Sequence, residues 1–197
     1  MKDFIRKIRK LILLPIRKIQ FGYFGSRSDY ISPIMITGKS HIYIDNYTVI
    51  RNNARIEAIT NFYGTRYDPK LNIGKRVTIE QGVHITCTDR VSIGDNTTIS
   101  SYVYISDTEH DHKVLGKNIF DLGLIVKPVE IGKCVFIGTG AKILSGVSIG
   151  DNCVVGANSV VTRNIPCNSM VAGIPARIIK IYDDNKKIWV IPKETIK

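Results

Sequence analysis

The stretch from Ile131 to Val161 repeats a six-residue pattern: IGKCVF, IGTGAK, ILSGVS, IGDNCV and VGANSV, followed by Val161. An aliphatic residue opens every hexad, and Gly follows it in four of the five. This period fits neither a 3.6-residue helix nor an alternating strand. It is typical of a solenoid in which each hexad forms one short strand and one turn, so that three hexads close a triangular coil. Coils must stack, because no hexad can bury its aliphatic side chain alone.

The first residue of each hexad is predicted to point into the prism. A small residue four positions later is predicted to lie inside beside it. The glycines are expected in turns that disfavour a Cβ atom. These small inward residues are Val135, Ala141, Val147, Cys153 and Ser159.

A looser form of the repeat occupies residues 36–59 and 73–106, which with 129–162 predicts about five coils. Aromatic, Gly and Pro residues interrupt it at 60–69, and a longer interruption spans 107–128. We therefore expect three segments. They are a basic N-terminal segment at 1–24, an all-β solenoid domain at 25–177 with a protruding loop at 107–128, and a C-terminal tail at 178–197.

The net charge of +11 is concentrated at the N-terminus. Residues 1–20 contain seven Lys and Arg against one acid, whereas residues 21–177 contain 16 against 13. A nucleic-acid reader should have a basic body, so this distribution argues against nucleic-acid binding. Up to Leu14 the pattern predicts a short amphipathic helix, which Pro15 interrupts. Two interpretations remain open: a basic helix resting on anionic lipid, and a cap over the open end of the solenoid.

The N-terminal segment is a poor signal peptide. Its apolar run, LILLPI, has six residues and no small-residue cleavage site follows. It is also too short to span a bilayer. The four cysteines include no CxxC pair, which indicates a reduced chain. We expect a cytoplasmic protein, with residues 1–20 as the segment for any peripheral contact at the inner face of the membrane.

The second interruption contains His110 and His112 among Asp107, Glu109 and Asp111. Long insertions in a compact domain are usually functional or disordered. Histidine suits a general base near neutral pH, and neighbouring carboxylates can raise its basicity and fix its tautomer. A solvated polar loop without catalytic function is the alternative.

The hexads, the histidine loop and the ending GANSVVTRNIP followed by VAGIPARIIK resemble the hexapeptide-repeat, left-handed β-helix acyltransferases. Within them, the chain is most similar to the sugar and polysaccharide O-acetyltransferases related to galactoside and maltose acetyltransferases. The resemblance covers residues 73–180 firmly and 36–59 loosely. Only the resemblance implies that the coils are left-handed, because the usual crossover between parallel strands is right-handed. It further implies acetyl-CoA as acyl donor, a carbohydrate acceptor, and a homotrimer with active sites between subunits.

The resemblance places the catalytic histidine at His110, three residues after Asp107, which we expect to support it. His112 is the alternative. The imidazole would remove a proton from a sugar hydroxyl, the alkoxide would attack the thioester carbonyl, and the proton would pass to the leaving thiolate. The family position for the backbone N–H that stabilises the oxyanion is Thr139.

For the cofactor, the resemblance points to the end of the solenoid. Ala157 matches a backbone contact to the pantetheine arm. Basic side chains are needed near the nucleotide phosphates. The matching positions are Thr162, Arg163, Arg177 and Lys180.

The chain departs from the galactoside and maltose enzymes in two places. Phe136 stands where those enzymes have Trp, and their acceptor-binding Asn and Asp align near Glu80 and Thr88, with Asp89 adjacent. We expect Glu80 and Asp89 to contact the acceptor. The departures argue against a simple galactoside or maltose, and favour a surface polysaccharide or its precursor.

Three alternatives remain open. An N-acetyltransferase of an amino sugar would use the same loop and cofactor. A γ-carbonic-anhydrase-like metalloenzyme shares the prism but needs three histidines around zinc, and His84, His110 and His112 lack its spacing. We therefore predict no metal. A non-catalytic scaffold would need neither the histidines nor the basic ending.

Overall fold

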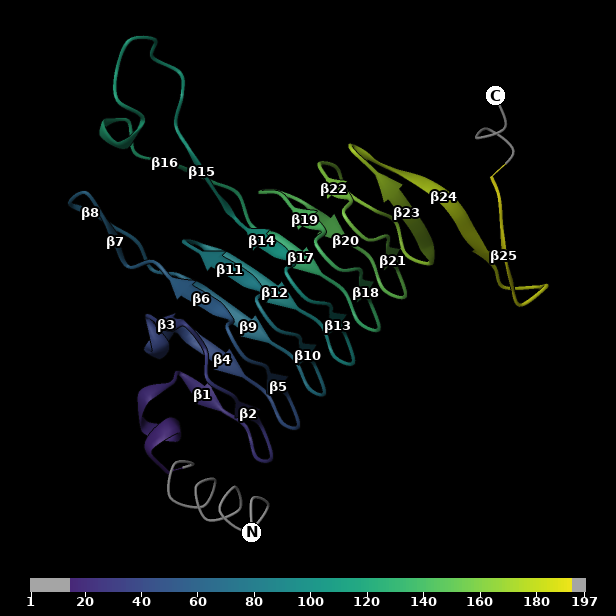
Figure 1. Ribbon diagram of the computed structural model, residues 1–197, viewed down its shortest axis with the longest axis horizontal. Coiled ribbons are helices and arrows are strands. Elements are labelled where there is room, and N and C mark those ends of the chain that lie inside the picture. The colour runs from purple at the N-terminus through teal and green to yellow at the C-terminus, as the bar shows by residue number, and fades with distance from the viewer. Residues whose placement is uncertain (1–14, 193–197) are drawn as a thin grey trace.

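A computed structural model describes residues 15–192 of the chain. The chain winds as a left-handed parallel β-helix, as the resemblance implied. Three parallel sheets, A, B and C, form the faces of a prism, and each coil adds one strand to each sheet (Figure 1). Residues 15–20 are helical and precede the first strand, whereas the helix predicted up to Leu14 lies outside the described residues. Within residues 15–192, no helix is long and apolar enough to cross a bilayer.

The strands of each sheet follow one another along the prism axis. Sheet A contains β1 (Tyr23–Phe24), β4 (Ile42–Ile44), β9 (Lys70–Ile73), β12 (Arg90–Ile93), β17 (Val129–Ile131) and β20 (Ser148–Ile149). Sheet B contains β2 (Asp29–Tyr30), β5 (Val49–Ile50), β10 (Thr78–Ile79), β13 (Thr98–Ile99), β18 (Phe136–Ile137), β21 (Val154–Val155), β23 (Ser169–Gly173), β24 (Ala176–Asp183) and β25 (Ile188–Val190). Sheet C contains β3 (Met35–Thr37), β6 (Arg55–Ala58), β11 (His84–Cys87), β14 (Tyr104–Ser106), β19 (Lys142–Ile143) and β22 (Val160–Val161).

The prism has six strands on sheets A and C, so it has six coils where about five were predicted. The additional coil is the first one, built from β1, β2 and β3, and aromatic rings occupy it where the later hexads have aliphatic residues. Phe21, Phe24 and Tyr30 pack against one another with ring centroids 5.1 to 6.1 Å apart. Arg17, from the helical residues, lies 3.9 Å above the ring of Tyr30 and pairs with Asp29. These contacts cover one end of the prism.

The inward positions are as predicted. Every aliphatic residue that opens a hexad between Ile131 and Val161 is at most 3% exposed, and so is every small residue four positions later. Burying an aliphatic side chain of this size stabilises a fold by roughly 1.5 to 3 kcal/mol. The stacked inward rows therefore form one continuous core.

The glycines that follow the aliphatic residues lie in turns that disfavour a Cβ atom, as predicted. A Cβ atom on Gly138 would lie 2.6 Å from the backbone nitrogen of Ala157 in the next coil. The residue with positive φ comes two positions after the glycine, as at Cys134 and Asn158, with φ of 56° and 55°. The glycine is required because turns of successive coils stack closely.

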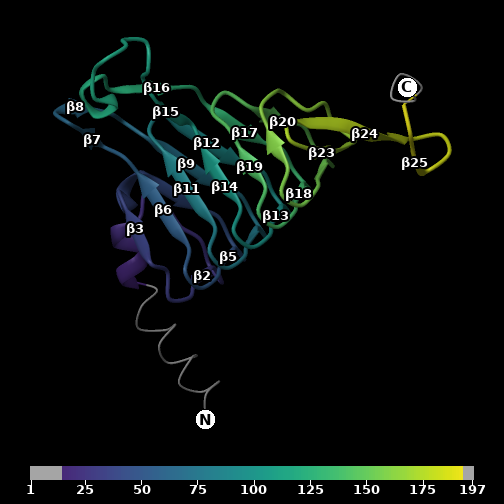
Figure 2. The same ribbon diagram turned by 45° about the horizontal axis from the view of Figure 1, so that its top comes forward.

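We name the prism edges by the sheets that they join. Both excursions leave from edge CA, and Figures 1 and 2 show them side by side. The first is the hairpin β7 (Asn61–Phe62) and β8 (Thr65–Arg66), and the second is the hairpin β15 (Thr108–His110) and β16 (Leu124–Val126) with the 3₁₀ turn η2 (Ile119–Asp121) between them. A further 3₁₀ turn, η1 (Lys39–His41), precedes β4. Edge CA comprises residues 38–41, 59–69, 88–89, 107–128, 144–147 and 162–164. Edge BC comprises residues 31–34, 51–54, 80–83, 100–103, 138–141 and 156–159.

Two expected segment boundaries fall inside or beside strands of the prism. β1 ends at Phe24 and already pairs with β4, so it belongs to the first coil. β24 continues sheet B across the expected boundary at 177/178 and pairs antiparallel with β23 and β25. Residues up to Val190 therefore extend the sheet.

Candidate active site

His110 lies on the second excursion, at the end of β15. The hairpin pairs Thr108 with Val126 and His110 with Leu124 in antiparallel register. β15 follows β14 directly, so the histidine is held by a two-stranded extension of the prism rather than by an irregular loop. This gives a side chain on a protruding loop a defined position.

Aromatic rings from both excursions surround the imidazole of His110. The ring centroid of Phe62 is 5.7 Å away and that of Phe120 is 5.2 Å away, the latter nearly perpendicular at 80°. Tyr63 stacks on Phe120 at 5.9 Å. Nδ1 of His110 is buried and has no hydrogen-bond partner within residues 15–192. A buried polar atom without a partner is rare in a folded protein, so this nitrogen marks His110 as a candidate functional residue.

The carboxylates expected to orient His110 point elsewhere. Asp107 accepts hydrogen bonds from backbone amides, and Glu109 accepts one from the hydroxyl of Ser145. Asp111 accepts a hydrogen bond from the backbone N–H of Lys113 in its own loop. Within the described residues, none of the three contacts the imidazole. The tautomer of His110 is therefore not determined by an acidic neighbour from the same loop, because Asp107 and Glu109 hold the excursion on the prism and Asp111 binds within the loop.

Asp107 is fully buried at the base of the excursion. Its Oδ1 accepts from the N–H of Thr88 at 2.8 Å, and its Oδ2 accepts from the N–H of Asp89 at 2.8 Å. The hydroxyl of Thr108 also donates to Oδ1 at 2.7 Å. Asp107 therefore supports His110 only through the backbone, by anchoring β15 to the preceding coil.

His112 is exposed, and its Nδ1 hydrogen-bonds to the carbonyl oxygen of His110 at 3.2 Å. It has none of the aromatic contacts of His110. Of the two histidines, His110 is the one that the fold encloses.

Thr139 and Ala157 occupy corresponding turns of successive coils on edge BC. The N–H of Asn158 donates to the carbonyl oxygen of Thr139 at 2.8 Å. The N–H of Thr139 has no acceptor among the described residues, so it can donate to an oxyanion. His110, however, leaves from edge CA. A single chain does not bring the predicted base and the predicted oxyanion donor together.

The predicted cofactor residues also divide between the edges. Arg177 pairs with Ala172 at the tip of the β23–β24 hairpin, and Gly173 donates to the hydroxyl of Ser159 at 3.2 Å. This places Arg177 beside the turn that contains Ala157. Thr162 and Arg163 lie on edge CA, and Lys180 pairs with Met170 at the opposite end of β23.

Glu80 and Asp89, the expected acceptor contacts, lie on different edges. Glu80 is on edge BC and pairs with Nε of Arg51 at 3.1 Å. Asp89 is exposed on edge CA beside the anchored turn of Thr88. Only Asp89 shares an edge with His110.

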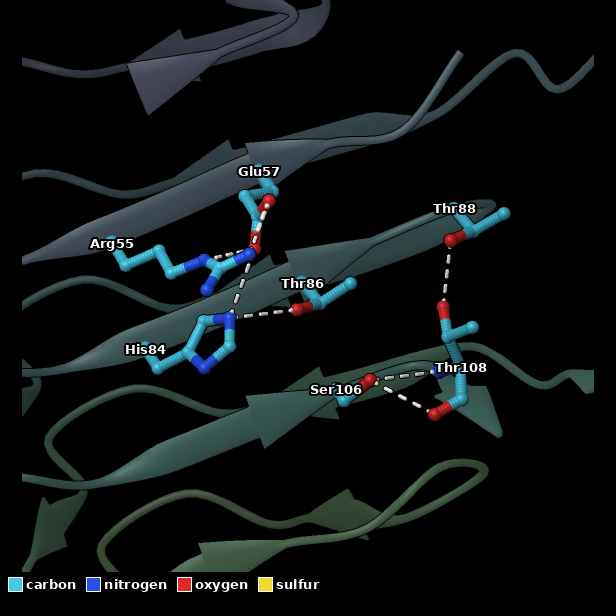
Figure 3. A network of polar contacts seen from close by, with 7 residues as sticks. All are labelled: Arg55, Glu57, His84, Thr86, Thr88, Ser106 and Thr108. Atoms are coloured by element: carbon cyan, nitrogen blue, oxygen red, sulfur yellow. Dashed lines mark hydrogen bonds and ion pairs between the residues drawn. The ribbon is translucent and has the colours of Figure 1, made fainter. Parts of the chain in front are cut away.

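A polar network on the outer face of sheet C was not predicted from the sequence (Figure 3). His84 hydrogen-bonds to Glu57, and Glu57 also accepts from Arg55. The packing of Phe62 and Phe120 around His110 was not predicted either. A signal for the network exists in the sequence, since Arg55 and Glu57 occupy outward positions of one strand and His84 an outward position of another. Recognising the network requires knowing how the strands before and after the interruption at 60–69 align with each other.

Across residues 15–192, no group of three or more His, Cys, Asp and Glu side chains gathers to hold a metal ion. His84 is on sheet C, away from the histidine loop. A shallow groove of about 950 Å³ crosses the outer face of sheet A between Arg90 and Cys167, and none of the predicted site residues lines it.

The comparisons with known proteins agree with this fold. Residues 128–163 match the family model described as bacterial transferase hexapeptide (six repeats). The putative lipopolysaccharide biosynthesis O-acetyl transferase WbbJ of Escherichia coli K12 is 36% identical over 154 residues, which are 71% of this chain and 79% of that protein. The galactoside O-acetyltransferase of the same strain is 31% identical over 176 residues, 88% of this chain and 83% of that protein. The chain belongs to the hexapeptide-repeat acyltransferases.

Solved structures of other acyltransferases have the same fold. A hexapeptide-repeat acetyltransferase from Vibrio cholerae superposes with a TM-score of 0.61 at 23% identity, covering 89% of this chain and 82% of that one. AntD, an N-acyltransferase from Bacillus cereus in complex with dTDP and coenzyme A, superposes with a TM-score of 0.66 at 22% identity, covering 87% and 90%. The expected acetyltransferase activity, with acetyl-CoA as donor, is confirmed by membership of this family.

Proposed function

We propose that this acyltransferase transfers an acetyl group from acetyl-CoA to a sugar hydroxyl, with His110 as general base. The observation that carries the proposal is the environment of His110. Its ring is enclosed by Phe62 and Phe120, and its buried Nδ1 has no partner within the described residues. An imidazole without competing hydrogen bonds can accept a hydroxyl proton from a bound acceptor.

The nature of the acceptor rests on the relatives. Both E. coli relatives are named as O-acetyltransferases, one of lipopolysaccharide biosynthesis and one of galactosides. Aromatic side chains around the base suit a sugar, because the apolar face of a sugar ring packs on an aromatic ring. A surface polysaccharide or its precursor is the acceptor that we propose.

The mechanism is direct transfer. The imidazole of His110 removes the proton of the acceptor hydroxyl, and the resulting alkoxide attacks the thioester carbonyl. The backbone N–H of Thr139 stabilises the tetrahedral oxyanion. As the intermediate collapses, the C–S bond breaks and His110 returns the proton to the coenzyme A thiolate.

The division between edges supports a site built from two chains. His110 protrudes from edge CA, whereas Thr139, Ala157 and Arg177 lie on edge BC. Edge CA of one subunit facing edge BC of another would complete the site. In a closed homotrimer every subunit supplies both edges, so three equivalent sites form. Thr162, Arg163 and Lys180 would then approach the cofactor phosphates from the end of the prism.

A second candidate is N-acylation of an amino sugar. The observation that favours it is the similarity to AntD, an N-acyltransferase, although at 22% identity that similarity concerns the fold. A neutral amine needs its proton removed only after attack, so the same base would serve. Acceptor assays with matched hydroxy and amino sugars separate the two reactions.

The test combines cofactor binding with thiol release. A ligand at about 100 times its Kd stabilises the native state by about 2.7 kcal/mol, so acetyl-CoA should raise the melting temperature of the wild type and of His110→Ala alike. Only the wild type should then release thiol with a glycan acceptor, because losing a general base lowers kcat by roughly 10²- to 10⁴-fold. His112→Ala is the matched control and should retain activity. A His110→Ala enzyme with wild-type kcat would exclude His110 as the base.

We also propose that the protein acts in the cytoplasm, with residues 1–20 contacting anionic lipid. The charge of this segment motivates the proposal. Deleting residues 1–14 should reduce sedimentation with vesicles containing anionic phospholipid and leave sedimentation with neutral vesicles unchanged.

A further inference from the structure

A histidine on the outer face of sheet C is oriented by a carboxylate (Figure 3). Nε2 of His84 lies 3.0 Å from Oε2 of Glu57. The same carboxylate receives two hydrogen bonds from Arg55, from Nε at 2.6 Å and from Nη2 at 3.0 Å. The three side chains come from adjacent strands, β6 and β11, in the register Arg55 opposite His84.

The carboxylate determines which nitrogen of His84 carries the proton. Burial raises the pKa of Glu57, but hydrogen bonds from Arg55 and His84 outweigh burial and lower that pKa below its ordinary value. Glu57 is therefore ionised near neutral pH and accepts a hydrogen bond from Nε2–H of His84. Nδ1 is then left with a lone pair that can accept a hydrogen bond from a hydroxyl.

The imidazole of His84 is also held sterically. The ring of Tyr104, from the next strand, lies 5.3 Å away and nearly perpendicular at 79°. The hydroxyl of Thr86 is 3.2 Å from Nε2. The side chain of His84 remains 33% exposed, whereas that of Glu57 is only 15% exposed. A partly buried acid thus presents an accessible imidazole at a fixed orientation.

Stability of the prism does not account for this network. The solenoid core is apolar, whereas the ion pair of Arg55 with Glu57 lies on the outer face, where such pairs stabilise a fold by about 0 to 1 kcal/mol. The equivalent outward positions in the following coils are occupied by Tyr104, Lys142 and Val160, and sheet C continues through them. A carboxylate, a guanidinium and an imidazole in one row are typical of a site that binds polar ligands.

The network lies in line with His110. His84 is opposite Tyr104 of β14, and the next strand, β15, follows after Asp107 and ends at His110, six residues after Tyr104. At about 3.3 Å per residue, this separates the two histidines by roughly 20 Å along the strand direction. A single sugar ring does not span that length, whereas several linked sugars do.

We propose that His84, oriented by Glu57, binds a hydroxyl of a distal sugar unit of the acceptor, so that the enzyme acts on an oligosaccharide or polysaccharide rather than on a monosaccharide. This inference rests on the proposed function. Arg55 holds Glu57 in place, and the free ring nitrogen of His84 accepts the hydroxyl hydrogen bond. His84 is thus a specificity-determining residue and takes no part in the transfer itself.

The experiment compares acceptors of different length. Thiol release from acetyl-CoA is measured with methyl glycosides of glucose, galactose and N-acetylglucosamine, and with trisaccharides of the same sugars. His84→Gln should raise KM for the trisaccharides about tenfold, with kcat, KM for acetyl-CoA and KM for the methyl glycosides unchanged. Glu57→Gln should produce the same pattern, because without the carboxylate the proton of His84 is no longer held on Nε2. Arg90→Gln, which removes the exposed ion pair with Glu130 on sheet A, is the matched control and should change none of these values.

Two kinetic outcomes would overturn the inference and leave the proposed function intact. One is an unchanged trisaccharide KM in His84→Gln, and the other is an equal rise for trisaccharides and methyl glycosides. If the wild type acetylates amines and no glycan hydroxyl, the proposed function fails. Binding of wild type and His84→Gln to an array of oligosaccharides then decides the inference separately, and equal binding by both proteins would reject it.

Discussion

The carboxylate of Asp107 accepts the backbone N–H of Thr88 with both oxygens, at 2.8 and 3.0 Å. Thr88 is at the edge-CA turn of one coil, and Asp107 is at the start of the excursion from the next. The contact therefore ties the hairpin that contains His110 to the coil beneath it. Asp107, which the sequence marked as a supporting residue, thus contacts the backbone of the preceding coil.

Asp107→Ala should destabilise the protein by about 3 kcal/mol, because it leaves the buried amide of Thr88 and the neighbouring amide of Asp89 without an acceptor. Activity should fall in addition, since β15 loses its anchor. Urea unfolding and thiol release measure the two effects. Asp111→Ala is the control, as Asp111 contacts only its own loop and its removal should change stability by less than about 1 kcal/mol.

Phe120→Ala should lower kcat by about tenfold and leave KM for acetyl-CoA unchanged. The ring of Phe120 packs nearly perpendicular to His110, so its loss frees the imidazole to adopt other rotamers. Tyr47→Ala is a matched control, because Tyr47 is exposed between β4 and β5, away from edge CA. Equal effects of the two substitutions would contradict a positioning role for Phe120.

The contribution of Glu57 to the free energy of unfolding should decrease at acidic pH. The pKa of Glu57 in the folded protein is below its ordinary value near 4.5, so the ionised form is stabilised by folding. Such a group adds stability above its unfolded-state pKa and loses it as the pH falls through the folded-state pKa. The difference in unfolding free energy between wild type and Glu57→Gln should therefore be constant above about pH 5.5 and shrink below about pH 4.5. A difference that stays constant in acid would contradict the lowered pKa of Glu57 in the folded protein.

The cysteines should differ in reactivity. Burial raises the pKa of the thiols of Cys87 and Cys153, whereas Cys134 and Cys167 are exposed. Because the thiolate is the reactive form, DTNB should modify Cys134 and Cys167 in the native protein and all four cysteines after unfolding. Rapid modification of Cys87 under native conditions would mean that the coil opens there.

Gly138→Ala should destabilise the prism by about 3 kcal/mol, since the added Cβ would lie 2.6 Å from the backbone nitrogen of Ala157. Gly64→Ala provides the contrast. Gly64 has φ of 89° and no atom within 4 Å of an added Cβ, so its substitution introduces only backbone strain of about 1 kcal/mol. Thermal unfolding of both variants would compare close stacking with strain directly.

The hexads predicted the coil and its inward rows correctly because the signal is local. An aliphatic residue every six positions, with Gly beside it, specifies the strand, the turn and the buried face without reference to the rest of the chain. The first coil escaped this pattern, because Phe24 and Tyr30 replace aliphatic residues where the prism ends. His110 and His112 were also noticed locally, by their position in an interruption of the repeat.

The contacts among the candidate site residues were not predictable in the same way. Phe62 and His110 meet because two interruptions, separated by two coils, leave from the same edge. His84 meets Glu57 because strands on either side of the first interruption pair in one register. Both facts depend on how many residues each interruption adds before the coil resumes, and a periodic pattern does not record that number.

The sequence by itself thus determined a parallel β-helix with a histidine-bearing excursion, since burial of a repeated aliphatic residue allows no other regular structure. Only the tertiary structure decided which side chains surround that histidine and which edge each predicted residue occupies. The physical reason is that stacking energy depends on the inward residues, whereas the outward residues are brought together by register. Side chains that are neighbours on the prism surface need have no fixed spacing along the chain.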